Sequence, residues 1–272
     1  MSRTSPPLGI AHFSCIETCP ADFVDLAGQV GYASVGLRLH PAFPGAPFYT
    51  LAPGSAEMRQ TKAALRQAGI GVYDIEFVVV DGAFSPTDLS AVLDSAAELG
   101  ARRLSVCGDD PDDGRFVANL SALAELAAAA GIAVDLEIMP WRQIGTLDAA
   151  VRAVAATEMT NVGVLVDALH LARSGGSPGD LSGLPPSMIR SVQLCDALAA
   201  RPEDTAALIA EARGGRLLPG LGALPLGDLL SVIPQDAAIS IEVPKGAETD
   251  EAHLRALFDA TIRILRTRTS AT

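Results

Sequence analysis

Short apolar segments alternate with helix-forming segments along the whole chain, and this alternation constrains the fold more than any other feature. Eight segments are short and rich in Val, Ile and Leu, as buried strands are. They span residues 8–14, 34–40, 70–78, 102–108, 132–140, 161–167, 189–196 and 237–244. Strands that alternate with helices form parallel sheets covered on both faces, so eight such units predict a closed (β/α)8 TIM barrel.

The intervening segments have the periodicity of amphipathic helices. Apolar residues recur at i, i+3 and i+4 in residues 55–68, 86–100, 114–130, 146–157 and 249–267. Gly69, Gly100 and Gly131 lie at the ends of such segments, as left-handed C-terminal caps do, and Thr146 is suited to begin one. Because no linker or clear repeat interrupts the pattern, we expect residues 1–272 to form a single domain.

The net charge and the cysteine content limit the kinds of partner and the cellular compartment that we expect for the protein. With 20 basic and 32 acidic residues the net charge is −12, which speaks against nucleic acid or an anionic membrane as partner. No segment reaches the roughly 18 apolar residues of a membrane span, and the N-terminus lacks the apolar core of a secretory signal. The four cysteines lack paired spacing, so we expect them to be reduced and buried in a cytoplasmic protein. A small-molecule substrate fits this composition, and a homo-oligomer remains open.

Oxygen-bearing side chains lie near the ends of the last four expected strands. They are Glu137, Asp167, Gln193 and Glu242. In a barrel these strand ends meet at one face, where the active site lies. Three carboxylates that face one another repel and raise one another's pKa unless a cation lies between them. All-oxygen ligands suit Mg²⁺ or Mn²⁺, so we predict a divalent-metal site. The alternative is four unrelated residues, each bonded to loop backbone.

The chain resembles the xylose-isomerase-like barrels, a group of sugar and sugar-phosphate isomerases, epimerases and related dehydratases. The resemblance rests on "LEIMPW", "VDALH", "VQLCDA", "EARGGRLLPGLG" and "ISIEVP". It implies that Glu137, Asp167, Gln193 and Glu242 hold the metal. Many epimerases of the family have His where this chain has Gln193. A Gln there is similar to the branch that contains 3-dehydroshikimate dehydratases.

The resemblance also implies proton abstraction beside a carbonyl group, with Glu137 and Glu242 as catalytic groups on opposite sides of the ion. His170, in the Asp-x-x-His of the family, would contact substrate or transfer a proton; otherwise it supports a helix start. Return of the proton gives epimerisation or isomerisation, and loss of a β-hydroxyl gives dehydration. The sequence favours a metal-dependent isomerase or epimerase of a small sugar, ketose or polyol derivative. The rival is a dehydratase of a cyclic hydroxyketone, of the 3-dehydroshikimate or inosose type.

Five further residues are candidates for substrate contact. Arg38 and Glu76 end the second and third expected strands, Trp141 follows the fifth, and Arg213 and Arg216 follow the seventh. Arginine forks suit carboxylate or phosphate groups. A local ion pair is the alternative for Glu76, and a core position is the alternative for Trp141.

Two other function classes are open to such a barrel. An endonuclease for abasic DNA would need additional histidine ligands and a basic surface, which four histidines and a charge of −12 oppose. A barrel that has lost its ligands can serve as a binding or structural subunit. All four strand-end oxygens are present in this chain, which favours an enzyme.

Overall fold

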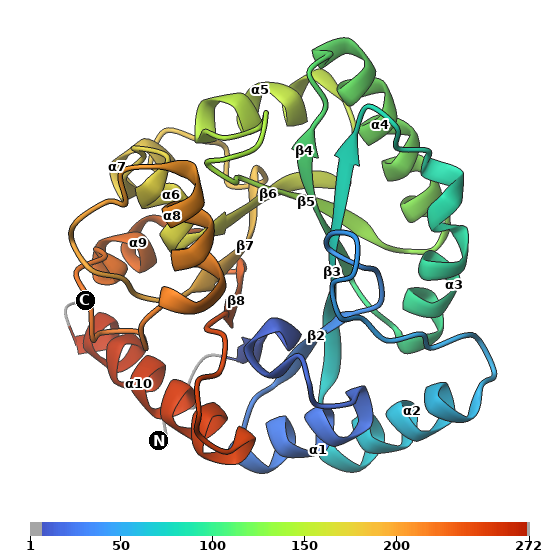
Figure 1. The fold of residues 1–272 in the computed structure, drawn as a ribbon, viewed down its shortest axis with the longest axis vertical. Coiled ribbons are helices and arrows are strands. Elements are labelled where there is room, and N and C mark those ends of the chain that lie inside the picture. The colour runs from blue at the N-terminus through green and yellow to red at the C-terminus, as the bar shows by residue number, and fades with distance from the viewer. Residues whose placement is uncertain (1–6, 271–272) are drawn as a thin grey trace.

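The computed structural model describes residues 7–270 and contains a closed barrel of eight parallel strands (Figure 1). Each strand pairs with the next along the chain, and β8 pairs with β1 to close the cylinder. The strands are β1 (Leu8–Ile10), β2 (Ser34–Arg38), β3 (Gly71–Asp81), β4 (Arg103–Asp109), β5 (Ala133–Glu137), β6 (Val162–Asp167), β7 (Ile189–Leu194) and β8 (Ala238–Ile241). The predicted TIM barrel is confirmed.

Helices surround the barrel and cover the outer face of the sheet (Figure 1). They are α1 (Pro20–Val30), α2 (Ala56–Ala68), α3 (Ser90–Leu99), α4 (Asp113–Ala129), α5 (Leu147–Ala156), α6 (Ala168–Arg173), α7 (Pro178–Leu181), α8 (Thr205–Ala210), α9 (Leu226–Val232) and α10 (Asp250–Ser270). Two 3₁₀ turns, η1 (His12–Cys15) and η2 (Pro86–Leu89), and one π-helical turn, η3 (Glu211–Gly215), complete the set. Within residues 7–270, no helix is long and apolar enough to cross a membrane.

The helix ends follow from local chemistry. The side chain of Thr146 accepts a hydrogen bond from the backbone N–H of Ala149 and so begins α5. Gly69 and Gly100 end α2 and α3 with φ of 69° and 70°, a left-handed conformation that residues with a Cβ rarely adopt. These predicted ends are confirmed.

The inside of the barrel is polar below the site. The Ser191 hydroxyl on β7 donates to Asp135 on β5 at 2.6 Å, and because β6 lies between these strands the bond crosses the interior. Asp135 also pairs with Arg103 at 2.8 Å, while Ser105 donates to Asp74 at 3.1 Å. Buried polar groups of this kind are tolerated where they are hydrogen-bonded. The apolar core therefore lies mainly between the strands and the helices, whose inner faces are fully buried.

Three expectations are corrected by the structure. β1 ends at Ile10, so His12 lies in the turn η1 rather than within a strand. Strand β3 continues to Asp81, which places Glu76 in the middle of the strand instead of at its end. All four cysteines are free, but Cys19 is exposed while Cys15, Cys107 and Cys195 are buried.

Candidate metal centre and active site

The four predicted ligands lie at one end of the barrel. Glu137 and Asp167 are the last residues of β5 and β6, Gln193 lies beside Asp167 in the β6–β7 register, and Glu242 directly follows β8. All four side chains are buried. The parallel strands bring them together because their carboxyl ends share one edge.

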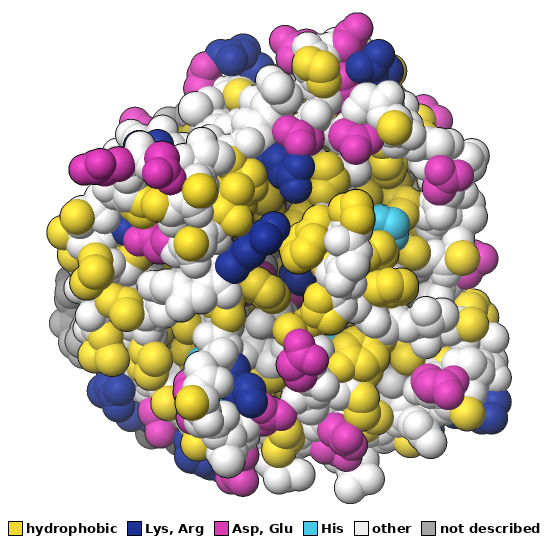
Figure 2. Space-filling model, in the orientation of Figure 1, with side chains coloured by type: hydrophobic (Ala, Val, Ile, Leu, Met, Phe, Trp, Pro, Cys, Tyr) yellow, Lys and Arg dark blue, Asp and Glu magenta, His cyan; other side chains and the backbone are white. Residues whose placement is uncertain are grey.

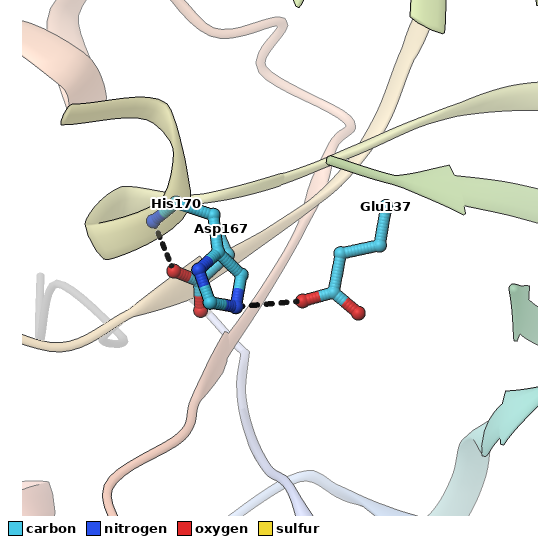
Figure 3. A group of neighbouring side chains, drawn as sticks. All are labelled: Glu137, Asp167 and His170. Atoms are coloured by element: carbon cyan, nitrogen blue, oxygen red, sulfur yellow. Dashed lines mark hydrogen bonds and ion pairs between the residues drawn. The ribbon is translucent and has the colours of Figure 1, made fainter. Parts of the chain in front are cut away.

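Three of the site residues lie close enough together to share one metal ion. Potential ligand atoms of Glu137, Asp167 and His170 all lie within 4.8 Å of one another (Figure 3). The imidazole Nε2 of His170 is 3.6 Å from Glu137 Oε1. Asp167 caps helix α6, since its Oδ1 accepts the backbone N–H of His170 at 2.9 Å. Asp167 is thus a helix cap as well as a member of the site, and His170 lies nearer to ligand position than its spacing in the sequence implied.

Arg216 lies among these carboxylates. Its guanidinium Nη1 donates to Asp167 Oδ2 at 2.5 Å, and its Nη2 is 3.0 Å from Glu242 Oε2 and 3.4 Å from His170 Nε2. The side chain is almost fully buried. A buried charge of this kind requires partners, and the two carboxylates supply them. The guanidinium therefore links Asp167 to Glu242 across the site.

Gln193 provides the clearest sign that the site is built for a further group. Its Nε2 donates to Glu242 Oε1 at 3.4 Å, but its buried carbonyl Oε1 has no hydrogen-bond partner among the described residues. An unpaired buried amide oxygen is costly. Together with Glu137, Asp167 and Glu242 it forms an oxygen-rich set that fits a hard divalent cation. The donor chemistry of these residues is therefore compatible with the predicted metal.

The same buried and charged environment shifts the pKa values of the ionisable groups in the site. Burial, followed by the charges of Glu242 and Asp167, raises the pKa of Glu137 well above its usual value. Burial raises the pKa of Glu242 to about 7 and lowers the pKa of His170 to about 4. Burial also acts to raise the pKa of Asp167, but Arg216 and His170 outweigh it and hold that pKa below its usual range. Proton-transfer groups with such shifts are typical of active sites.

Glu76 and Arg38 form a second polar group at the β1–β3 side of the barrel. Glu76 accepts the backbone N–H groups of His12 and Phe13 at 2.5 and 3.2 Å, and pairs with Arg38 Nη2 at 3.2 Å. The Arg38 guanidinium lies 4.7 Å from the ring centre of Phe13 and 5.4 Å from that of Phe77. Arg38 is buried, and its Nε has no partner within residues 7–270. Glu76 therefore positions Arg38 and the turn after β1.

The mouth of the barrel is bordered by Arg213 and Trp141. The guanidinium of Arg213 stacks 4.3 Å from the ring centre of Phe43, an exposed residue of the β2–α2 loop. The Trp141 ring meets the His170 ring edge-on at 5.1 Å. Figure 2 shows Lys and Arg side chains in the hollow near the centre of this face, although the whole chain is acidic.

The structure brings together most of the residues that the sequence singled out. Glu137, Asp167, His170, Gln193, Glu242 and Arg216 form one cluster. Arg213 lies outside that cluster, against Phe43. Sequence reasoning missed Phe13, Phe43 and Phe77, because an isolated aromatic residue in a loop or strand carries no periodic signal. It also missed the buried pair of Arg173 and Glu211, whose members are 38 residues apart.

Comparisons with known proteins agree with this geometry. Residues 24–267 match the family model described as xylose isomerase-like TIM barrel. A 3-dehydroshikimate dehydratase of Pseudomonas aeruginosa is 29% identical over 146 residues, which is 52% of this chain and 22% of that protein. The matched segment is therefore a small part of that longer relative.

Solved structures share the fold over nearly the whole chain. The structure of the IolI protein with a bound zinc atom matches with a TM-score of 0.79 and 16% identity, covering 97% of this chain and 99% of that one. A D-psicose 3-epimerase of Clostridium cellulolyticum matches with a TM-score of 0.70 and 15% identity, covering 97% and 99%. At such identities the likeness concerns the fold. With the family model matching most of its length, the chain belongs to the xylose isomerase-like TIM barrel family.

Proposed function

We propose that this protein is a divalent-metal-dependent dehydratase of a cyclic hydroxyketone that carries a carboxylate, the 3-dehydroshikimate type. The observation that carries the proposal is Arg38, a buried cation whose Nε lacks a partner within the described chain. The charge of Arg38 lowers the pKa of both Glu137 and Glu242, which supports a position of the guanidinium near these carboxylates. A planar guanidinium that lies close to two aromatic rings suits a substrate carboxylate.

Two further observations support a dehydratase over the isomerase or epimerase that the sequence alone favoured. Gln193 stands where many epimerases of the family have His. The partial match to a 3-dehydroshikimate dehydratase points to the same reaction. A neutral ketose offers no anion to Arg38, whereas a carboxylated ring does. The epimerase remains the second candidate because its structural relatives share the whole barrel.

In this proposal Glu137, Asp167, Gln193 and Glu242 would hold Mg²⁺ or Mn²⁺, and His170 Nε2 lies close enough to take part. The ion would supply a Lewis acid for the negative charge that develops on the ketone oxygen. The zinc of the IolI structure makes Zn²⁺ a necessary competitor in any metal test.

The residues of the chain would carry out the proton transfers. Glu242, with its pKa raised to about 7 by burial, removes the proton from the carbon beside the ketone. The β-hydroxyl then leaves with that proton as water, and a carbon–carbon double bond forms. Glu137 is the second acid–base group and serves the opposite face of the substrate. His170, neutral near pH 7, orients a substrate hydroxyl by hydrogen bonding.

The reaction is tested by incubating the purified protein with Mn²⁺ and 3-dehydroshikimate. Dehydration creates an aromatic product, so ultraviolet absorbance should rise. Glu242→Gln should lower kcat by about 10²–10⁴-fold through loss of the general base. Glu125→Gln, a change at an exposed position of α4, is the matched control. If no absorbance develops while a ketohexose is epimerised, the second candidate replaces the first.

The role of Arg38 is tested by measuring the effect of its substitution on KM and on kcat separately. Arg38→Met should raise KM about 10–100-fold, since hydrogen bonds to charged groups contribute about 1.5–3 kcal/mol. The methyl ester of the substrate should show the same penalty with the unmodified enzyme. Because Arg38→Met removes the ion-pair partner of the buried Glu76 carboxylate, Arg38→Met/Glu76→Gln serves as a second variant. An unchanged KM in both variants would contradict a carboxylate subsite at Arg38.

A further inference from the structure

Helix α6 carries two residues of the site and ends in a buried arginine that the site itself does not explain. Asp167 caps the helix, and His170 and Arg173 follow at intervals of three residues. The Arg173 side chain is only 5% exposed, far less than an arginine at the end of a short helix normally is. Its partners therefore need to be identified.

Arg173 forms hydrogen bonds with three other residues. Its Nε and Nη2 donate to the two carboxylate oxygens of Glu211, each at 2.7 Å, and Nη2 also donates to the carbonyl of Leu198 at 2.7 Å. The backbone carbonyl of Arg173 accepts Arg201 Nε at 2.8 Å. A two-pronged pair of this geometry fixes direction as well as distance. Hydrogen bonds and an ion pair thus connect the C-terminal end of α6 to the segment that follows β7.

Glu211 is the first residue of the π-helical turn η3, and Arg216 directly follows that turn. The Arg216 Nε donates back to the carbonyl of Ala212 at 3.0 Å, while its other nitrogens bind Asp167 and Glu242. Two ion pairs therefore join α6 and η3 at both ends, Asp167 with Arg216 and Arg173 with Glu211. π-Helical turns are rare and are frequent at functional sites.

The orientation of His170 depends on where α6 lies. Its Nδ1 is buried and has no hydrogen-bond partner among residues 7–270, so no bond from that atom fixes the ring. The ring is placed instead by Trp141, at 5.1 Å, and by Glu137 and Arg216 on the Nε2 side. A shift of α6 would move this imidazole directly.

We infer that the Arg173–Glu211 pair is a positioning element that sets both His170 and Arg216 in the active site. Burial of the Arg173 charge costs desolvation, and such an ion pair is poor evidence of added stability, so its geometry is the better account of its presence. Neither residue reaches the ligand cluster, and each acts through a neighbour. The inference rests on the proposed active site, but not on which reaction takes place there.

Trp141 is the only tryptophan of the chain and lies against His170, so its fluorescence reports on α6 without any metal or substrate. The experiment measures acrylamide quenching of Trp141 in the metal-free parent, Glu211→Gln and Arg173→Lys. Asp135→Asn is the matched control, because it breaks a buried arginine–carboxylate pair beneath the site. We expect stronger quenching in Glu211→Gln and Arg173→Lys, and parent-like quenching in Asp135→Asn. Parent-like quenching in a folded Glu211→Gln and in Arg173→Lys would overturn the inference.

A double-variant cycle separates positioning from a general loss of stability. Mn²⁺ affinity is measured for Glu211→Gln, Arg216→Gln and the double variant. Loss of an outer partner of a metal ligand typically lowers affinity about 10-fold or more. We expect each single variant to show such a loss and the double variant to lose less than the sum of the two single losses, because part of the effect of Glu211→Gln passes through the Arg216 guanidinium. Full additivity would overturn the inference. A parent protein that binds no Mn²⁺ would refute the proposed function, while the quenching result would still decide the role of the pair.

Discussion

At the scale of single residues, the balance between burial and the charges around a carboxylate sets the direction of its pKa shift. Asp167 has Arg216 and a backbone N–H, and its pKa falls. Asp74 has the hydroxyl of Ser105 at 3.1 Å. Burial, followed by the charge of Glu76, therefore raises the pKa of Asp74 well above its usual value. The pKa values of Asp167 and Asp74 are thus shifted in opposite directions within one barrel.

Asp74 should make the folded protein less stable as the pH rises. A group whose pKa is higher in the folded state contributes stability that is complete below its unfolded pKa of about 3.9 and is lost as the pH passes the folded pKa. Asp74→Asn removes this titration, so the variant should gain stability relative to the parent as pH increases. Urea unfolding of metal-free protein at several pH values between 5 and 9 measures this. A constant stability difference across that range would contradict the raised pKa.

At the scale of elements, β2 depends on a glycine that leaves room for the carboxylates of β3. A Cβ on Gly36 would lie 2.6 Å from Asp74 Oδ1 and closer still to Glu76 Oε1. Real Cβ atoms do not approach oxygen atoms so closely, and both carboxylates are held by other bonds. The small residue therefore allows Glu76 to reach His12 and Arg38.

Gly36→Ala should destabilise the protein by about 1–3 kcal/mol, as overpacking of a core does. It should also weaken substrate binding, because Glu76 positions Arg38. Gly71→Ala on β3 is the control, since nothing lies within 4 Å of its Cβ position. Denaturant unfolding of both variants provides the comparison. Equal stability of Gly36→Ala and Gly71→Ala would show that the two carboxylates move aside freely.

The periodicity of apolar residues identifies strands and helices, but it locates their ends less well. All eight strands were foreseen, because each is a short apolar run between helical segments. The expected end at Asp167 is confirmed, but the end of β3 was placed too early. The pairing of β3 with β4 continues to Asp81 and Asp109 after a register shift near Ile75, and no local pattern encodes that shift. Glu76 was consequently placed at the end of a strand whose middle it occupies.

At the scale of the whole molecule, closure of the barrel brings the carboxylates of β5, β6 and β8 together. Arg216 supplies a positive charge that pairs with Asp167 and Glu242. A bound ion would add stability to the folded state alone.

Metal should therefore raise Tm measurably. An ion at 100 times its Kd stabilises a protein by about 2.7 kcal/mol, which corresponds to several degrees for a chain of this size. Differential scanning calorimetry with Mn²⁺, Mg²⁺ or Zn²⁺, and then with a chelator, measures the shift. Glu137→Gln should reduce it, and Glu125→Gln, at an exposed position of α4, should leave it intact. An identical Tm with and without each ion would contradict a metal site.

The sequence by itself determined the barrel and the identity of the oxygen-bearing side chains at its strand ends. Both are local properties, since strand periodicity and the residue that closes a strand are read from neighbouring positions. The tertiary structure alone decided that Arg216 pairs with both Asp167 and Glu242, that Arg38 lies close to two phenyl rings, and that Arg173 pairs with Glu211. These contacts join residues distant in the chain, since Asp167 and Arg216 are 49 positions apart. They depend on the paths of loops, which no repeating pattern specifies, and on the closure of the sheet that makes those loops meet.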